Sequence, residues 1–285
     1  MTRPLGGSDP ELESNPAAVT LCAAMSGPEI VGLILAAAAG GAINAVAGGG
    51  TLVTFPTLLF FKTPSVIANA TSTLALVIGN SGSIYGFRRH LNAVKPWLMR
   101  FVPVSIAGGL IGAWLLTRTE EKVFSKLVPF LILFATLLFL AQGPVRRLIK
   151  SDAGSAAAPK SHAIGGAIIF QLAVAIYGGY FGAGIGILML ASLGFIGLGN
   201  IHEMNTLKTI LGSLINLVAA IWFIFAGLIH WPKAGVMTLG ALTGYYLGAH
   251  YSQRIPQQRV RQIITAIGFI LSAVTFYQQF VQKRG

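Results

Sequence analysis

The sequence predicts an all-α polytopic membrane protein made of two repeated helical bundles. Of its 285 residues, 54% are hydrophobic and only 10% are charged, and the mean hydropathy is +0.72. A soluble domain carries about 25% charged residues, so an ordinary soluble enzyme and a disordered chain are both excluded. The apolar residues form long runs, and these runs follow the same order in both halves of the chain.

The first 27 residues are polar and carry Asp9, Glu11 and Glu13 among glycines and prolines. They lack the basic segment followed by an apolar segment that marks a signal peptide. We therefore expect residues 1–27 to form a polar, disordered tail ahead of the first membrane segment.

The rest of the chain contains ten apolar runs. A helix needs about 20 residues to cross a bilayer at about 1.5 Å per residue. Eight runs are therefore predicted to be long transmembrane helices, and two short ones follow glycine-rich breaks. The runs are 29–47, 51–61, 66–87, 97–117, 123–142, 163–181, 185–197, 204–227, 233–250 and 257–280.

A basic segment, 143–162, separates a first repeat at 28–142 from a second at 163–281. Another basic loop, with Arg88, Arg89 and Lys95, is separated from this linker by an even number of crossings. Because basic loops stay in the cytoplasm, both are predicted to be cytoplasmic, which also accounts for much of the net charge of +12. The repeats are inverted if each short run returns the chain to its starting face, and parallel if it does not.

The repetition is visible at a constant separation of 136 positions. Asparagine and proline matches carry more weight than glycine matches, because the chain has 35 glycines. An arrangement of two such halves is typical of secondary transporters. The matched pairs are Gly48 with Gly184, Gly50 with Gly186, Asn69 with Asn205, Thr73 with Thr209, Asn80 with Asn216, and Pro96 with Pro232.

The two glycine-rich breaks are candidate anion sites. The first runs from Asn44 to Thr51 through Gly48, Gly49 and Gly50, and the second contains Gly184 and Gly186. Each glycine costs a helix about 1 kcal/mol relative to alanine, so the chain should unwind at both. A helix restarting at Thr51 or Ile187 would aim free N–H groups at a cavity, which suits an anion. Alternatively, the glycines only allow close helix packing.

Polar residues recur at helical spacing in runs 66–87 and 204–227. Asn69, Thr73 and Asn80 lie close to one helical face, and Asn205, Thr209 and Asn216 repeat that face. These side chains either face the substrate path or hydrogen-bond neighbouring helices.

Lys208 lies inside the apolar run 204–227, where a charge is costly and indicates a substrate or ion path. The alternatives are that it extends to the surface or pairs with Glu203. No carboxylate falls in the middle of a long apolar run, which disfavours a cation as substrate. The five histidines lie singly, and motifs for ATP hydrolysis or proteolysis are absent from the sequence. We therefore expect no enzyme activity, no metal site and no cofactor.

The segment from Gly41 to Pro56, followed by Ala68-Asn69-Ala70-Thr71-Ser72-Thr73, resembles the sulfite exporter TauE/SafE family of membrane permeases. The second half, with Gly178 to Gly186 and Asn205 to Lys208, resembles that family's second repeat. The resemblance covers about residues 28–280. It implies a multi-pass protein of the bacterial inner membrane that exports a small sulfur-containing anion, such as sulfite, thiosulfate, sulfoacetate or a related organosulfonate. No threonine in the second break matches Thr51, which argues against equal roles for the halves.

The sequence thus predicts a secondary transporter that moves a small anion by alternating access. A passive anion channel and a non-transporting scaffold or sensor are the alternatives. The expected partners are the anionic substrate and the lipid bilayer, and not nucleic acid; a coupling proton or sodium ion and a homo-oligomer stay open. The predicted substrate-binding residues are Asn44, Gly48, Gly49, Gly50, Thr51, Asn69, Thr73, Asn80, Gly184, Gly186, Asn205, Lys208, Thr209 and Asn216.

Overall fold

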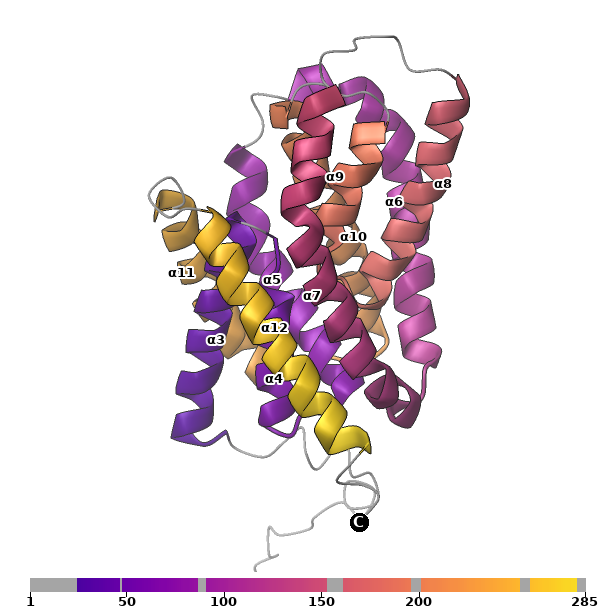
Figure 1. The fold of residues 1–285 in the computed structure, drawn as a ribbon. Helices are drawn as coiled ribbons and strands as arrows, with labels where there is room; N and C mark the ends of the chain where they lie inside the picture. Colours follow the sequence, from indigo (N-terminus) through magenta and orange to yellow (C-terminus); the bar gives the residue numbers. More distant parts are fainter. Residues whose placement is uncertain are drawn as a thin grey trace, which may run out of the picture.

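The computed structural model describes residues 25–46, 48–86, 91–152, 161–195, 201–251 and 257–280. Within these ranges the chain forms helices joined by short connections, and it contains no strand (Figure 1). The helices are α3 (Gly27–Val46), α4 (Thr51–Phe60), α5 (Ser65–Gly86), α6 (Leu91–Arg118), α7 (Glu121–Asp152), α8 (Ser161–Tyr180), α9 (Ile185–Phe195), α10 (Ile201–Phe225), α11 (Trp231–Tyr251) and α12 (Gln257–Phe280).

The predicted alternation of long and short helices is confirmed. In the described residues each half contains one long helix, one short helix and three further long helices. Helices α4 and α9 have 10 and 11 residues, whereas α3 and α8 have 20 each and α7 has 32. Among the described residues, four segments are by length and composition apolar enough to cross a membrane, namely Gly27–Ala45, Val94–Arg118, Glu121–Ala141 and Glu203–Phe225.

Helix α7 extends beyond its predicted end. The apolar run stops at residue 142, but the helix continues to Asp152. Gly143 and Pro144, which follow the run directly, are poor helix formers, but Arg146, Arg147, Leu148 and Lys150 after them are good ones, and the helix continues through both groups. The first half of the predicted linker 143–162 is therefore helical, and residues 153–160 lie outside the described ranges.

Short helix α4 runs back along α3. A side-chain carbon added at Gly32 would lie 2.8 Å from the Phe61 ring, and one at Gly40 would meet Thr54 at 2.7 Å. The end of α4 therefore lies near the start of α3, so the short run returns the chain toward the end from which it came. Figure 1 shows α3 starting near one end of the bundle and α8 starting near the other.

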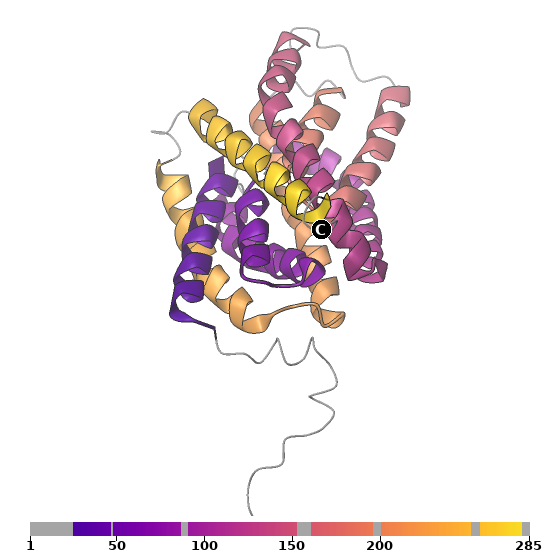
Figure 2. The ribbon, with the colours of Figure 1, turned by 60° about the horizontal axis from the view of Figure 1, so that its bottom comes forward.

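The third long helix of each half packs with the other half. Helix α11 packs along α3 and α5, whereas α6 packs along α8 and α10. We call α3, α4, α5 and α11 the α3 group, and α6, α8, α9 and α10 the α8 group. Figure 2 shows α3 and α11 side by side, with α6 and α8 on the other side of the molecule.

Glycines make these exchanged contacts close. On α11, Gly240, Gly244 and Gly248 are spaced by four residues, and each lies directly against the α3 backbone. On α6, Gly108 and Gly112 lie in the same way against α8. Small residues that let backbones approach are the usual basis of helix packing in membranes. On these faces the glycines therefore allow close helix packing, which the sequence analysis gave as the alternative to an anion site.

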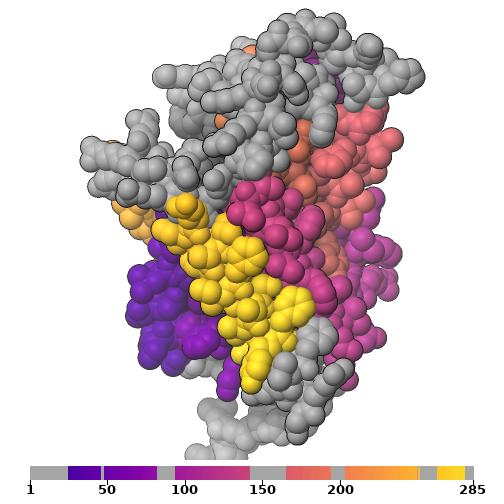
Figure 3. All heavy atoms as spheres, in the orientation of Figure 1, coloured from indigo at the N-terminus to yellow at the C-terminus, as the bar shows by residue number. Residues whose placement is uncertain are grey.

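Helices α7 and α12 pack together across the face seen in Figure 3. Their outer surfaces expose large apolar side chains, as expected for helices in contact with lipid acyl chains. These side chains include Leu127, Phe130, Phe134, Leu137 and Leu140 of α7, and Ile263, Phe269, Ile270, Val274 and Tyr277 of α12.

Candidate functional site

Both glycine-rich breaks and the polar faces of α5 and α10 surround one cavity of about 150 Å³. A water molecule takes up about 30 Å³ in the liquid, so the cavity has room for a small polyatomic ion. It is lined by Asn44, Ala45, Gly48, Gly49, Thr51, Thr73, Leu76, Val77, Asn80, Phe181, Gly182, Gly184, Ile185, Gly186, Lys208, Thr209, Gly212, Ser213, Asn216 and Tyr245.

Most of the predicted site residues are brought together here. The lining includes Asn44, Gly48, Gly49, Thr51, Thr73, Asn80, Gly184, Gly186, Lys208, Thr209 and Asn216. They come from segments more than 150 positions apart in the chain, which only the packing of the two groups unites. Gly50, Asn69 and Asn205 are not part of the lining.

In the first break the end of α3 leads directly into the start of α4. Gly48 has a φ of +77°, and its N–H donates to the Ile43 carbonyl at 3.2 Å. This left-handed residue ends the helix in a way that favours glycine. The Asn44 Oδ1 atom accepts a hydrogen bond from the Gly50 N–H at 3.1 Å, so a side chain of α3 satisfies a donor at the start of α4.

The second break ends α8 in a similar way. Gly182 has a φ of +80°, and its N–H donates to the Tyr177 carbonyl at 3.2 Å. The counterpart of Gly48 in conformation is thus Gly182, although the separation of 136 positions pairs it with Gly184. Gly184 also has a φ of +80°, and α9 starts at Ile185 instead of the expected Ile187. The separation between Gly48 and Gly182 is therefore two positions shorter than the 136 positions that match α5 with α10.

Gly50 packs against the other arm of its hairpin. A side-chain carbon there would collide with the carbonyl of Gly40, and its N–H is engaged by Asn44. The expectation that Gly50 presents its N–H to an anion does not agree with this geometry. Gly50 instead allows α3 and α4 to approach each other.

Asn69 also has a different place from the one expected. It is buried in α5, and its Nδ2 donates to the carbonyl of Tyr180 at 3.0 Å. Asn69 thus ties α5 to the last residue of α8, one helical turn away from the cavity residue Thr73. Its counterpart Asn205 is half-buried in α10, outside the lining.

Helices α5 and α10 meet through a hydrogen bond at the cavity. Asn80 Nδ2 donates to Ser213 Oγ at 2.7 Å. The residue matching Ser213 in the first half is Val77, which cannot form the equivalent bond with Asn216. Asn216 lies instead beside the second break, because a side-chain carbon at Gly182 would lie 3.3 Å from Asn216 Oδ1. The cavity is therefore chemically asymmetric.

Lys208 reaches across the start of α9. A side-chain carbon added at Gly186 would lie 3.3 Å from Lys208 Cδ, so the lysine stem fills the space that a larger residue would need. Lys208 is half-buried and lines the cavity. This places a cation beside the start of a helix, where the dipole is also positive.

The sequence reading missed several lining residues. Ser213 lies on the helical face of Thr209 and Asn216, so its spacing was a usable signal. Tyr245 had no such signal, because α11 joins the cavity through its packing with α3 and α5 of the other half. The Tyr245 hydroxyl lies 2.5 Å from Asn44 Nδ2, which donates to it.

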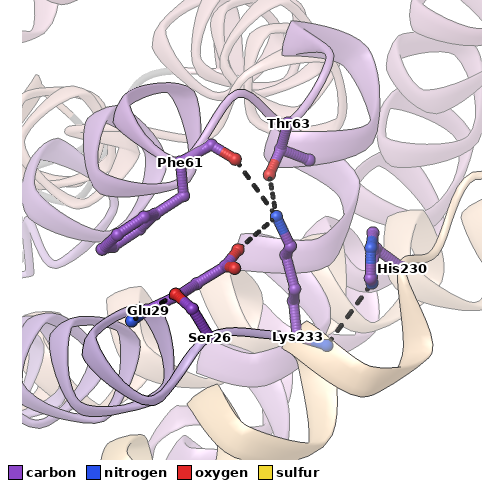
Figure 4. A network of polar contacts seen from close by, with 6 residues as sticks. All are labelled: Ser26, Glu29, Phe61, Thr63, His230 and Lys233. Atoms are coloured by element: carbon purple, nitrogen blue, oxygen red, sulfur yellow. Dashed lines mark hydrogen bonds and ion pairs between the residues drawn. The ribbon is translucent and has the colours of Figure 1, made fainter. Parts of the chain in front are cut away.

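A second polar cluster lies outside the cavity, at the starts of α3 and α11 (Figure 4). Lys233 Nζ lies 2.7 Å from Glu29 Oε1, and it donates to the Phe61 carbonyl at 3.2 Å and to Thr63 Oγ1 at 3.0 Å. The His230 Nδ1 accepts from the Lys233 backbone N–H at 3.5 Å. The sequence reading did not identify this cluster, because its members come from three separate segments.

Comparison with known proteins places the chain in a family. The sequence profile described as "Sulfite exporter TauE/SafE" matches residues 33–275. A "Probable membrane transporter protein" of Haemophilus influenzae is 29% identical over 83% of this chain and 90% of its own length. The "Probable membrane transporter protein YfcA" of Escherichia coli K12 is 26% identical over 91% of this chain and 94% of its own.

A third relative, the "Probable membrane transporter protein ORF9" of a Sinorhizobium species, is 27% identical over 84% of this chain and 89% of its own length. No solved structure matches the chain at a significant level. The profile covers most of the sequence, and the relatives, all named as membrane transporters, match over nearly their full lengths. This protein belongs to the sulfite exporter TauE/SafE family of multi-pass membrane transporters.

Proposed function

We propose that this protein exports a small sulfur-containing oxyanion across the bacterial inner membrane by alternating access. The observation that carries the proposal is the convergence of two helix starts and Lys208 on one cavity. Thr51 is the first residue of α4, Ile185 is the first residue of α9, and both line the cavity. A helix start carries a positive dipole end, which favours an anion. The N–H groups of Leu52, Val53 and Ile187 already donate to Gly49, Gly50 and Gly184, so the attraction at these starts comes mainly from the dipoles.

The remaining polar lining suits an oxyanion. Asn44, Asn80, Thr209 and Asn216 supply amide and hydroxyl groups that can donate hydrogen bonds, and Lys208 supplies the positive charge. The Thr73 hydroxyl lines the cavity but donates its hydrogen to the Asn69 carbonyl at 2.8 Å. Charge-assisted hydrogen bonds from several such donors are stronger than bonds between neutral groups. Aspartate and glutamate are absent from the lining, as expected for a site that takes a negative ion.

The position of the cavity supports alternating access. It is lined by the α3 group on one side and by the α8 group on the other, and each group contains helices of both halves. The contacts of α3 with α11 correspond to those of α8 with α6 when the halves are interchanged. Helices α3 and α8 start at opposite ends, which supports a proposal of two inverted repeats in which one group would rock against the other around a central site.

Substrate identity rests on the family name and on the chemistry of the cavity. Sulfite, thiosulfate and sulfoacetate are small anions with several acceptor oxygens, which match several convergent donors.

All eight long helices would cross the bilayer, including those that are less apolar because they face the cavity or another helix.

The test is transport by purified protein in proteoliposomes, with sulfite, thiosulfate, sulfoacetate and acetate as substrates. We expect saturable flux of at least one sulfur anion, and a Lys208→Met variant should lose about tenfold or more in affinity, because it removes a charged donor. Lys126→Met is the matched control, since Lys126 is exposed on α7 and outside the cavity.

The alternatives give different results in the same assay. A passive channel would show flux that does not saturate and does not depend on a counter-ion. A scaffold or sensor would show no flux of any anion. Wild-type transport by Lys208→Met would remove Lys208 from the site.

A further inference from the structure

Tyr245 has a defined place in the cavity. Its side chain comes from α11 and is 6% exposed. Two glycines make room for its ring: a side-chain carbon at Gly41 would lie 3.1 Å from Tyr245 Cδ2, and one at Gly79 would lie 2.9 Å from the same atom. The ring is thus held between α3 and α5, with its hydroxyl beside Asn44 at the cavity wall.

The neighbours of the hydroxyl determine where its hydrogen points. Asn44 Oδ1 accepts from the Gly50 N–H at 3.1 Å, so the amide nitrogen of Asn44 faces the other way. That nitrogen donates to the Tyr245 oxygen at 2.5 Å. A phenol oxygen that accepts a hydrogen bond keeps its own O–H hydrogen for another acceptor. The chain from Gly50 through Asn44 to Tyr245 therefore leaves the Tyr245 hydroxyl as a donor at the cavity wall.

We propose that the Tyr245 hydroxyl donates to one oxygen of the transported anion while Lys208 binds another oxygen, so that Tyr245 selects polyatomic oxyanions. This inference rests on the proposed function and adds a residue and a ligand requirement to it. A monatomic anion has one centre for both donors, whereas a sulfite or sulfonate group offers separate oxygens. A cavity of about 150 Å³ is large enough for such a group.

The two donors also belong to different parts of the protein. Tyr245 lies in the α3 group, because α11 packs along α3, and Lys208 lies in the α8 group. One bound oxyanion would therefore connect the two groups through a hydrogen bond on each side. Ligand binding would then favour the conformation in which the groups are close, as differential binding to one state requires.

The experiment compares Tyr245→Phe with Tyr246→Phe in purified protein, by isothermal titration with sulfite, sulfoacetate and bromide. Tyr246 is the next residue of α11 and is 72% exposed, so it controls for loss of a tyrosine hydroxyl. We expect Tyr245→Phe to raise the sulfite Kd by about tenfold, as for a lost hydrogen bond to a charged group, and to change bromide binding much less. Tyr246→Phe should bind as the parent does.

A second variant addresses the case in which Tyr245→Phe does not fold. Placing 3-fluorotyrosine at position 245 keeps the ring and makes the hydroxyl a stronger donor, so the sulfite Kd should fall by about twofold or more. A purely structural role of Tyr245 would leave this value unchanged.

The outcomes separate this inference from the proposed function. Unchanged sulfite binding in Tyr245→Phe, or equal weakening of sulfite and bromide, overturns the role of Tyr245, while a loss in Lys208→Met still supports the anion site. If the parent protein neither binds nor transports any of these anions, both proposals are overturned.

Discussion

Glu29 and Lys233 form an ion pair of a half-buried carboxylate with a buried ammonium group, with 2.7 Å between Oε1 and Nζ, and it joins the first turn of α3 to the first turn of α11. The side chains are 16% and 7% exposed, respectively. Lys233 also bonds Phe61 and Thr63 after the end of α4, so one ammonium group connects three segments of the α3 group. This cluster closes the end of the group at which α3 begins.

We predict that Lys233→Met destabilises the protein more than Glu29→Gln does. Removing the lysine leaves the Glu29 carboxylate without its cation, and breaking a buried pair from one side costs about 3 kcal/mol or more. In Glu29→Gln, the lysine keeps two oxygen acceptors. Thermal unfolding in detergent measures the difference, and the double variant should lose less than the sum of the single losses. Additive losses would show that the pair is not coupled.

Glycine packing on α11 gives a second prediction. A side-chain carbon at Gly244 would collide with the carbonyl of Ala38, so Gly244→Ala should push α11 away from α3 and lower the melting temperature. Gly235→Ala is the control on the same helix, because nothing lies within 4 Å of its added carbon. Alanine favours helix by about 1 kcal/mol, so this control should be neutral or stabilising. Equal effects of both changes would contradict the proposed contact.

The two breaks should respond differently to alanine. Gly50→Ala places a methyl group against the Gly40 carbonyl, so it should reduce stability. Gly186→Ala meets only the flexible stem of Lys208, at 3.3 Å, so it should displace the lysine and weaken anion binding with little change in stability. Melting temperatures with and without sulfite measure both effects. A stable Gly50→Ala protein that no longer responds to sulfite would restore Gly50 as an anion ligand.

Membrane orientation can be tested with single cysteines in a Cys22→Ser background. Ala226 lies exposed in the turn between α10 and α11, and Gly165 lies exposed near the start of α8. The start of α11 lies beside the start of α3 through the Glu29–Lys233 pair, and α8 starts near the other end of the molecule. Because the basic linker should be cytoplasmic, an impermeant thiol reagent should label Ala226→Cys and not Gly165→Cys in intact cells. A permeant reagent should label both. The reverse pattern would invert the orientation, and equal labelling would place both positions on one face.

Local sequence was enough to predict the helices and many of the residues that line the cavity. Runs of apolar residues set helix length, and the glycines at Gly48 and Gly184 marked breaks that the structure contains. The spacing of Thr73 with Asn80, and of Thr209 with Asn216, placed these side chains on the faces that line the cavity. Such signals depend on one helix at a time, so they can be read without knowing the fold.

The rest depends on contacts between distant segments. Gly50 has the same local signature as Gly49, and only its approach to Gly40 distinguishes it. Tyr245 enters the cavity because α11 packs with the opposite half, and no periodicity in its own helix indicates this. The Glu29 and Lys233 pair joins residues about 200 positions apart in the chain, and the local sequence around either residue does not indicate the other.

The exchange of α6 and α11 between groups has a consequence for biosynthesis. The α3 surface that receives Gly240, Gly244 and Gly248 is made near the beginning of translation, and its partner emerges about 200 residues later. During that time this face of α3 lacks the α11 helix that packs on it in the folded protein. Contacts between segments far apart in the chain form slowly. A ribosome that stalls before α11 is made would therefore leave a nascent chain in which the α11-binding face of α3 has no partner helix.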